Sequence, residues 1–295
     1  MVVDGNVING KAIAERIISS LSGRFEALAE RLKRPVVLLG IESGINPDSK
    51  AYIRSQQSLA SRLGVEYRHR QVGPYQKDLE QAVRMAVQDS SVDGIILHTP
   101  FPTGVDVFNA LRLLSPEKDV EGVSPINVFG MFFRQEGTIF PPTPRAVLRI
   151  LDELDVNIRG RRVVIVGEGA VVGRPLSVMF LQRGATVSVC HLPTSERGDL
   201  PEYVSRAEIL VSAVGKAGLI KGEWIKEDAV VIDVGINFVG SRIVGDVEFD
   251  VAKDKAKLIT PVPGGVGPVT TAILMENLYL LVKEKLNGRE RPSYK

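Results

Sequence analysis

The sequence is short of the residues on which several kinds of protein depend. It has one cysteine, Cys190, so neither an internal disulfide nor a thiolate metal cluster can form. No stretch approaches the roughly 20 apolar residues that a membrane-spanning helix needs, and the N-terminus lacks the apolar core of a secretion signal. Thirty-seven basic and 35 acidic side chains give a net charge of +2, without a basic block that would follow a phosphate backbone. These absences favour a cytoplasmic protein without a metal, a membrane or a nucleic acid as partner.

What is present is ordinary globular material, 44% hydrophobic and 24% charged, in a chain long enough for two domains of typical size. Apolar residues at helical spacing predict one helix over residues 13–32, and a continuous apolar run predicts a buried strand over 36–41. The alternation continues with a helix at 49–63, a strand at 65–72, a helix after 76 and a strand at 92–97. Fully apolar strands separated by helices predict a parallel sheet.

A second segment with the same alternation follows a proline-rich stretch. Residues 141–144 read Pro-Pro-Thr-Pro, which cannot be helical throughout, and we place a domain boundary there. Beyond it, strands are expected at 161–166, 185–190, 209–214 and 230–234, with helices between the first three. A final apolar helix over 269–286 follows a Pro/Gly cluster, and its pattern is compatible with packing on either domain.

The strongest local motif is a glycine-rich loop at the end of an apolar strand. Val163–Val166 leads into Gly167–Gly173, and a helix is expected to begin near Pro175. Glycines in this context allow a tight turn and a close approach to a pyrophosphate at the helix N-terminus, which favours dinucleotide binding over a purely structural turn. The spacing departs from the commonest fingerprint, because three residues rather than two separate the last pair of glycines. No carboxylate ends the second strand at Val189–Leu192, so Glu168 is the nearest acidic reader of the ribose.

Six segments agree in order and spacing with one enzyme family. They are Pro47–Tyr52, Val92–Ile95, Lys118–Gly122, Gly167–Pro175, Asp233–Asn237 and Pro263–Pro268. On these segments the chain resembles the methylenetetrahydrofolate dehydrogenase/cyclohydrolase family over nearly its whole length.

The resemblance implies an α/β fold of two domains with a folate cleft between them. An N-terminal α/β catalytic domain that binds folate is expected over residues 1–140, completed by a C-terminal helix over 269–295. A Rossmann-like NAD(P)-binding domain is expected over 141–268. We also expect a homodimer formed through the cofactor domains, on the apolar strand Ala185–Cys190.

The same resemblance assigns site residues by position. Catalytic roles fall to Tyr52, Gln56 and His98. Substrate contacts are expected from these three and from Thr99, Pro100, Glu121, Pro263, Gly264, Gly265, Val266 and Gly267. Cofactor contacts are expected from Gly167, Glu168, Gly169, Val172, Gly173, Arg174, Pro175, His191, Leu192, Ala213, Val214, Gly215, Gly235 and Ile236. No metal site is expected.

The departures from the family pattern concern the cyclohydrolase reaction. Gln56 stands where the family carries the lysine that serves hydrolysis of the methenyl bridge. Tyr52, Gln56 and Leu59 share one helix face by spacing, so Gln56 is expected to point into the cleft. A glutamine amide cannot exchange a proton near neutral pH, whereas hydride transfer needs no such exchange. His98 replaces a family glutamine, and two interpretations stay open: it forms hydrogen bonds as that glutamine would, or it serves as a substitute base.

Three further departures concern ligand recognition. Glu121 replaces the family aspartate that binds the pterin, so its carboxylate sits one methylene further out, which is compatible with tetrahydrofolate or a modified pterin. Glu168 replaces the arginine that contacts a 2′-phosphate, and Leu192 replaces the serine that assists it. A carboxylate there disfavours NADP and can accept bonds from a 2′-hydroxyl, so NAD is expected as the cofactor.

The sequence therefore predicts an oxidoreductase of one-carbon metabolism, a NAD-dependent enzyme that oxidises methylenetetrahydrofolate to methenyltetrahydrofolate without cyclohydrolase activity. One alternative is a bifunctional enzyme that uses His98 as its base. Another is a non-catalytic folate or dinucleotide sensor, although a sensor has no need of the hydride-transfer segments. A dehydrogenase for another small acid, such as a shikimate-type substrate, would have no reason to carry the folate segments.

Overall fold

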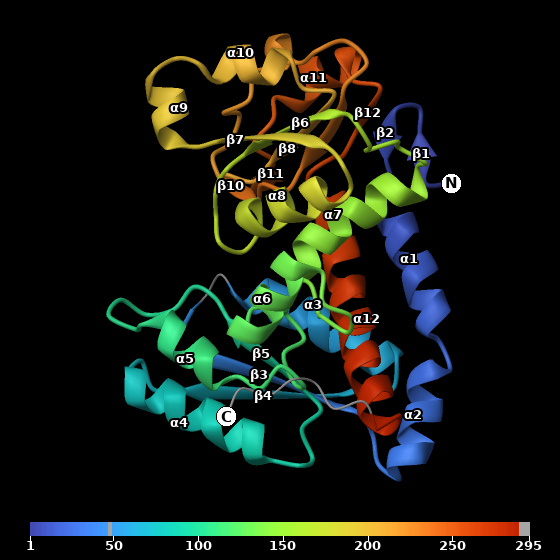
Figure 1. The fold of residues 1–295 in the computed structure, drawn as a ribbon, viewed down its shortest axis with the longest axis vertical. Coiled ribbons are helices and arrows are strands. Elements are labelled where there is room, and N and C mark those ends of the chain that lie inside the picture. Colours follow the sequence, from blue (N-terminus) through green and yellow to red (C-terminus); the bar gives the residue numbers. More distant parts are fainter. Residues whose placement is uncertain (47–48, 289–295) are drawn as a thin grey trace. The chain divides into compact units, whose positions relative to one another are not determined.

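A computed structural model describes residues 1–46 and 49–288 of the chain. Contacts divide these residues into two compact units (Figure 1). Unit 1 comprises Met1–Arg16 and Thr143–Thr270, and unit 2 comprises Ile17–Pro142 and the chain from Thr271 onward. The division at Pro142 falls inside the proline-rich stretch. The first sixteen residues belong to unit 1, which differs from the expected division at residues 1–140.

Unit 1 is built on a seven-stranded sheet in the order β1-β2-β12-β9-β8-β6-β7 (Figure 1). The strands are β1 (Val3–Asp4), β2 (Val7–Ile8), β6 (Arg162–Val166), β7 (Thr186–Cys190), β8 (Ile209–Ser212), β9 (Val230–Asp233) and β12 (Leu258–Ile259). Every neighbouring pair from β2 to β7 is parallel, and only β1 with β2 is antiparallel. The expected α/β class is confirmed, and β1 and β2 are additions that the apolar pattern had not predicted.

Helices and a small hairpin complete unit 1. They are α7 (Pro142–Glu153), α8 (Gly173–Gln182), α9 (Leu192–Glu196), α10 (Leu200–Ser205), the 3-10 turn η1 (Gly222–Trp224), β10 (Asn237–Val239), β11 (Arg242–Val244) and α11 (Phe249–Lys255). Both Pro142 and Pro144 lie in the first turn of α7, where a missing N–H breaks no helical bond.

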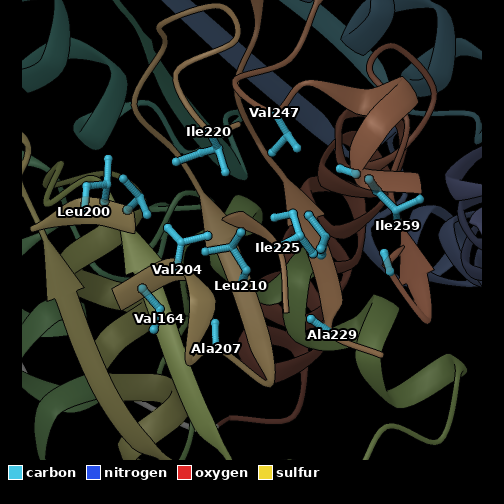
Figure 2. Close-up of a cluster of buried hydrophobic side chains, with 14 of the residues drawn as sticks. Val164, Leu200, Val204, Ala207, Leu210, Ile220, Ile225, Ala229, Val247 and Ile259 are labelled. Atoms are coloured by element: carbon cyan, nitrogen blue, oxygen red, sulfur yellow. The ribbon is translucent and has the colours of Figure 1, made fainter. Parts of the chain in front are cut away.

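One face of this sheet packs into an apolar core with α10, η1 and α11 (Figure 2). Val164 and Leu210 come from adjacent parallel strands and meet Val204 of α10 and Ile225 after η1. Cys190, the last residue of β7, is 1% exposed and belongs to the same core. Burial raises the pKa of its thiol to about 11, so it stays protonated and unreactive near neutral pH.

Unit 2 is built on a three-stranded parallel sheet in the order β4-β3-β5. Its strands are β3 (Val37–Ser43), β4 (Glu66–Val72) and β5 (Gly94–His98). Its helices are α2 (Arg24–Leu32), α3 (Ser49–Arg62), α4 (Gln76–Gln88), α5 (Val107–Leu113), α6 (Pro125–Phe133) and most of α12 (Val266–Leu286). No helix in the described ranges is both long and apolar enough to cross a membrane.

The single helix expected over 13–32 is wrong. The structure has α1 (Gly10–Leu21) and α2, separated at Gly23, whose φ of 73° is left-handed. A glycine adopts this conformation at little cost, and it ends the run of helical hydrogen bonds. The apolar spacing nevertheless continues across the break, because Leu21 and Phe25 are both buried.

The two faces of the β4-β3-β5 sheet differ in chemistry. Val37, Leu39 and Ile41 of β3 alternate onto one face and pack with apolar residues of β5, α4 and α5. The opposite face carries Gly40 and Glu42 of β3, together with Tyr67 and His98 from the flanking strands. This second face contacts α3 through hydrogen bonds between side chains, as described below.

An ion cluster around the buried Asp93 joins the start of β5 to other parts of unit 2. Asp93 accepts two hydrogen bonds from the Arg34 guanidinium, at 2.6 and 2.8 Å, and one from the Val37 amide at 3.0 Å. The Nζ of Lys285, in α12, lies 3.3 Å from the same carboxylate. Desolvation raises the pKa of Asp93, but the hydrogen bonds from Arg34 and the Val37 amide and the charges of Lys285 and Arg34 together outweigh it and hold the pKa below its ordinary value. Stability from this group is therefore present above pH ~4 and lost as the pH falls through the lowered pKa.

We expect Asp93→Ala to lower the free energy of unfolding by about 3 kcal/mol, because it leaves Arg34 and the Val37 amide without their partner. Urea unfolding monitored by circular dichroism measures the change. Glu117→Ala is the matched control, since Glu117 is exposed in the same unit. A loss no larger than that of the control would contradict the assigned role of Asp93.

Candidate active site

Two of the predicted catalytic residues, Gln56 and His98, lie in one layer of polar side chains between α3 and the β4-β3-β5 sheet. Gln56 of α3 is fully buried, and His98, at the end of β5, is 4% exposed. The Tyr67 hydroxyl of β4 bridges them, donating to Gln56 Oε1 at 3.0 Å and lying 2.9 Å from His98 Nε2. The shared helix face of Gln56 and Leu59 is confirmed by the burial of both, although Gln56 packs inward against Tyr67.

Gly40 makes this bridge possible. Because β3 lies between β4 and β5, residue 40 faces the contact between Tyr67 and His98. A Cβ at Gly40 would lie 2.4 Å from Tyr67 Oη and 2.5 Å from His98 Nε2. Any larger residue would push these two groups apart, so glycine is required by space rather than by backbone conformation.

A second polar pair lies beside the first. Glu42 Oε2 is 3.1 Å from His69 Nε2, and Glu42 Oε1 accepts a hydrogen bond from the Ser49 hydroxyl at 2.5 Å. The side chain of His69 is partly exposed, as expected for a strand surface residue, while that of Glu42 is nearly buried. The rings of His69 and His98 stand edge to face with centroids 6.0 Å apart, which links the two pairs.

His98 is held in its neutral form. The pKa of His98 is lowered to about 4. Burial is the main cause, the neighbouring His69 acts in the same direction, and Glu42 opposes the shift. At pH 7 its imidazole therefore carries one proton and no charge. A base with so low a pKa is seldom protonated near neutral pH, which weakens the interpretation of His98 as a substitute general base.

Tyr52 and Glu121 border the same layer. Tyr52 is 37% exposed as a whole, and desolvation raises the pKa of its hydroxyl. Glu121 Oε2 accepts from the Leu97 amide at 3.3 Å. The pKa of Glu121 is raised to about 8. Burial is the main cause, the nearby charge of Asp119 adds to the rise, and the hydrogen bond from the Leu97 amide opposes it. This carboxyl is therefore largely protonated at neutral pH.

The other predicted substrate residues lie on two loops. Thr99 and Pro100 directly follow β5, are exposed and are joined by a cis peptide bond. Pro263–Gly267 leads into α12 and belongs to unit 1, with Gly265 and Val266 buried. A Cβ at Gly10 would lie 1.8 Å from the Gly265 carbonyl oxygen, so α1 approaches this loop closely. Pro47 and Asp48, the start of the segment that ends at Tyr52, lie outside the described residues.

In unit 1 the predicted cofactor loop connects β6 to α8. Gly167 has a φ of 110°, and a Cβ there would lie 2.3 Å from the Ala213 carbonyl oxygen. A Cβ at Gly173 would lie 1.9 Å from the Gly167 carbonyl oxygen, whereas around Gly169 the space is open. Two glycines thus close the turn and one leaves room beside the N-terminus of α8. Pro175 is buried in the first turn of that helix, and Val172 directly precedes it. This arrangement fits a dinucleotide pyrophosphate.

The two residues expected to select the ribose are both exposed. Glu168 Oε2 lies 3.2 Å from an Arg174 guanidinium nitrogen, with half of the Glu168 side chain exposed. Exposed pairs of this kind contribute about 0–1 kcal/mol, so a ribose hydroxyl can compete with Arg174 for the carboxylate. Leu192 is 70% exposed at the start of α9, and His191 caps that helix through Thr194.

A buried carboxylate shapes the neighbouring loop of unit 1. Asp246 accepts hydrogen bonds from the amides of Val214, Gly215 and Lys216 at 2.8, 3.3 and 2.9 Å. It also accepts from the Ser212 hydroxyl and from the Asn237 amide. Three successive N–H groups that converge on one carboxylate fix the path of the loop after β8, where cofactor contacts are expected.

A second aspartate supports the first from the end of β9. Asp233 accepts bonds from the amides of Gly235, Asp246 and Val247. Burial raises the pKa of Asp233 to about 6, and these amide bonds partly offset the rise while the charge of Asp246 adds to it. A Cβ at Gly235 would lie 2.1 Å from Asp246 Oδ1, so this predicted cofactor residue is a glycine because the carboxylate fills the adjacent space. Ile236, which follows it, is 60% exposed.

A cavity of about 550 Å³ lies at the opposite end of the same sheet. It is lined by residues before or at the start of β6, β8, β9 and β12, including Arg161, Glu208, Lys226 and Lys257. Ligands of open parallel sheets bind at the carboxyl ends of the strands, where Gly167 and Ala213 lie. The cavity is therefore separate from the predicted cofactor loop. In the described ranges no cluster of three or more His, Cys, Asp or Glu side chains could hold a metal ion.

The structure adds Gly40 and Tyr67 to the candidate site, and neither was predicted from the sequence. Tyr67 and His69 are two residues apart and therefore lie on one face of β4, a spacing that is compatible with any strand and does not indicate a site. Only the register of β3 with β4 brings Gly40 opposite this pattern. The sequence signal was thus too general to select these residues.

The geometry defines a class: a two-domain α/β protein with a Rossmann-like unit and a separate unit that carries a buried polar site. Sequence comparison specifies it further. A model of the tetrahydrofolate dehydrogenase/cyclohydrolase catalytic domain matches residues 8–121, and a model of the NAD(P)-binding domain of the same family matches residues 141–286. The chain belongs to the tetrahydrofolate dehydrogenase/cyclohydrolase family.

Individual relatives agree with this assignment. The bifunctional protein FolD 2 of Geobacter sulfurreducens is 40% identical over 274 residues, covering 92% of this chain and 94% of that protein. The bifunctional protein FolD of Anaeromyxobacter dehalogenans is 40% identical over 281 residues, covering 94% and 98%. The crystal structure of Trypanosoma brucei methylenetetrahydrofolate dehydrogenase-cyclohydrolase, complexed with NADP and an inhibitor, is similar with a TM-score of 0.91 and 36% identity, covering 96% and 98%.

We expect Glu121 to titrate with a midpoint near pH 8, because its charged form loses hydration and lies near Asp119. Carbon-13 labelling of glutamate carboxyl groups measures this directly, and the Glu121→Gln variant identifies the resonance by its loss. The carboxyl should be protonated below this pH and ionised above it. A midpoint below pH 6 would contradict the assigned burial of this group.

Proposed function

We propose that the chain is a NAD-dependent methylenetetrahydrofolate dehydrogenase that lacks cyclohydrolase activity. The observation that carries the proposal is the buried amide of Gln56, at the position from which the family's lysine serves hydrolysis. Its hydrogen-bonding neighbour Tyr67 keeps its proton because burial raises the pKa of its hydroxyl. His98 is neutral with a pKa of about 4. None of these three groups readily accepts or releases a proton near pH 7.

Oxidation of the methylene bridge places few chemical demands on this layer. The folate nitrogen lone pair expels the hydride, and a bound nicotinamide accepts it. The protein has to hold the folate and exclude water, which Tyr52, Glu121 and the polar layer around Gln56 are suited to do. Hydrolysis of the methenyl bridge needs proton transfers during water attack, and none of Gln56, Tyr67 and His98 is a suitable donor or base for them. The substitution thus removes one activity and spares the other.

A bifunctional enzyme is the second candidate, because His98 could still serve as the base. The burial of His98 and the occupation of its Nε2 by Tyr67 argue against it. A non-catalytic sensor is disfavoured because it would have no need of the glycine-lined dinucleotide loop and the Pro263–Pro268 segment together.

The proposed activity is tested with methylenetetrahydrofolate and NAD or NADP, by following cofactor reduction. NAD is expected to give the higher kcat/KM, since Glu168 repels a 2′-phosphate and accepts from a 2′-hydroxyl. The Trypanosoma relative binds NADP, so the preference rests on residues of this chain and not on relatives. Glu168→Arg with Leu192→Ser should move the ratio of the two kcat/KM values toward NADP by at least about tenfold. A wild-type preference for NADP would refute this interpretation of Glu168.

The absence of hydrolysis is tested by the decay of methenyltetrahydrofolate absorbance. Wild-type protein should hydrolyse it no faster than buffer. Gln56→Lys should restore at least about tenfold acceleration, a modest part of what general acid–base catalysis supplies. His98→Gln is the companion variant. Rapid decay with wild-type protein would refute the monofunctional proposal, and its loss in His98→Gln would identify histidine as the base.

We also propose a homodimer formed through unit 1. The strand β7 lies at the edge of the seven-stranded sheet, and Val189 is 37% exposed on it. An exposed parallel-sheet edge pairs readily with a second copy. Light scattering at micromolar concentration should give twice the 32.1 kDa of one chain. Val189→Lys should shift the protein toward monomer, and a monomeric wild type would exclude the dimer.

A further inference from the structure

The amide of Gln56 uses only part of its hydrogen-bonding capacity. Its Oε1 accepts from Tyr67, whereas Nε2 has no hydrogen-bond partner among residues 1–46 and 49–288. The side chain is fully buried. Leaving a buried amide nitrogen without an acceptor costs free energy, and native proteins do so rarely. The unused Nε2 therefore points to an acceptor atom that a ligand brings.

The direction of the hydrogen bonds follows from counting protons. Tyr67 has a single O–H, and burial raises the pKa of this hydroxyl, so the proton stays on it. That proton is used in the bond to Gln56 Oε1. The contact of 2.9 Å to His98 Nε2 is then a hydrogen bond only if His98 donates. Neutral His98 must carry its proton on Nε2 and leave Nδ1 bare.

The reverse direction is the alternative to be excluded. If the amide were turned over, Gln56 would donate to Tyr67, Tyr67 would donate to His98, and the proton of His98 would sit on Nδ1. The geometry favours the first direction, because Oε1 of Gln56, and not Nε2, lies 3.0 Å from the Tyr67 hydroxyl.

We propose that Tyr67 is a positioning residue that holds Gln56 with its NH2 group directed as a donor to an acceptor atom of the bound folate, and that the Nε2–H tautomer of His98 sets this direction. The acceptor class is a carbonyl oxygen or an unprotonated ring nitrogen of the reduced folate. This inference rests on the proposed folate site.

The arrangement is built into the packing of the sheet. Gly40 leaves the space in which the Tyr67 hydroxyl meets His98, since a Cβ there would lie within 2.5 Å of both groups. The contact joins α3, β4 and β5 with β3 beneath it. No step of hydride transfer uses the Tyr67 hydroxyl. Its proposed role is to orient Gln56, and through it the substrate.

A kinetic test separates this role from simple stabilisation of the fold. Tyr67→Phe should raise the KM for methylenetetrahydrofolate about tenfold, the loss expected for one hydrogen bond of about 1.4 kcal/mol. The kcat and the KM for NAD should stay within about twofold. Tyr75→Phe is the matched control, because Tyr75 is exposed before α4. An unchanged folate KM in Tyr67→Phe overturns the proposal.

A double-mutant cycle tests whether Tyr67 acts through Gln56. Gln56→Met removes the amide at similar volume and should raise the folate KM by a similar factor. In that background Tyr67→Phe should add less than about twofold. If it adds its full effect, Tyr67 does not act through Gln56 and the proposal fails.

Nitrogen-15 NMR of the free protein tests the direction without any activity. The chain has three histidines, so His98→Gln assigns the resonances of His98 by their loss. The wild type should show the proton on Nε2 and a bare Nδ1, and Tyr67→Phe should mix the two tautomers. A proton on Nδ1 in the wild type overturns the proposed direction. An enzyme inactive toward folate would refute the proposed function, whereas the tautomer result would stand by itself.

Discussion

The parallel pairing of β3 with β4 on one side and β5 on the other is the constraint on which the candidate site depends. This register brings Gly40 of β3, Tyr67 of β4 and His98 of β5 onto one face, where α3 adds Gln56. The opposite face is apolar and fixes the sheet against α4 and α5. Because side chains alternate along each strand, a slip of one residue would place the polar groups in that core. Packing of the apolar face thus fixes the strand register that brings the polar side chains together.

Buried titratable groups serve different proposed tasks in the two units. In unit 1 the carboxylates of Asp233 and Asp246 are surrounded by backbone N–H groups and serve to hold loops in place. In unit 2 the titratable groups nearest Gln56 are shifted toward their neutral forms, as His98 and Glu121 show. A neutral, desolvated site suits a hydride transfer, in which no proton has to enter or leave.

The sequence was sufficient for features whose signal is local. Apolar runs identified the central strands of both sheets, and the glycine spacing after Val166 identified the tight turn between β6 and α8. The candidate site residues came mostly from family resemblance, and the structure shows that Gln56 and His98 share a hydrogen-bonded layer. Contacts distant in sequence could not be predicted. The two-residue strand β2 pairs with β12, which is distant in sequence. The need for a glycine at position 40 follows only from the register of β3 with β4 and β5. The break at Gly23 was not predicted, because the apolar spacing continues across it.

The burial of Cys190 has a practical consequence for studying motion in this protein. Its thiol is shielded in the core of unit 1 and resists ionisation, so thiol-reactive dyes and spin labels should leave it unmodified in the folded state. The natural chain can therefore serve as the parent for labelling without prior removal of cysteine. One new cysteine on an exposed position of each unit would report the distance between the units, and its change when folate and dinucleotide bind.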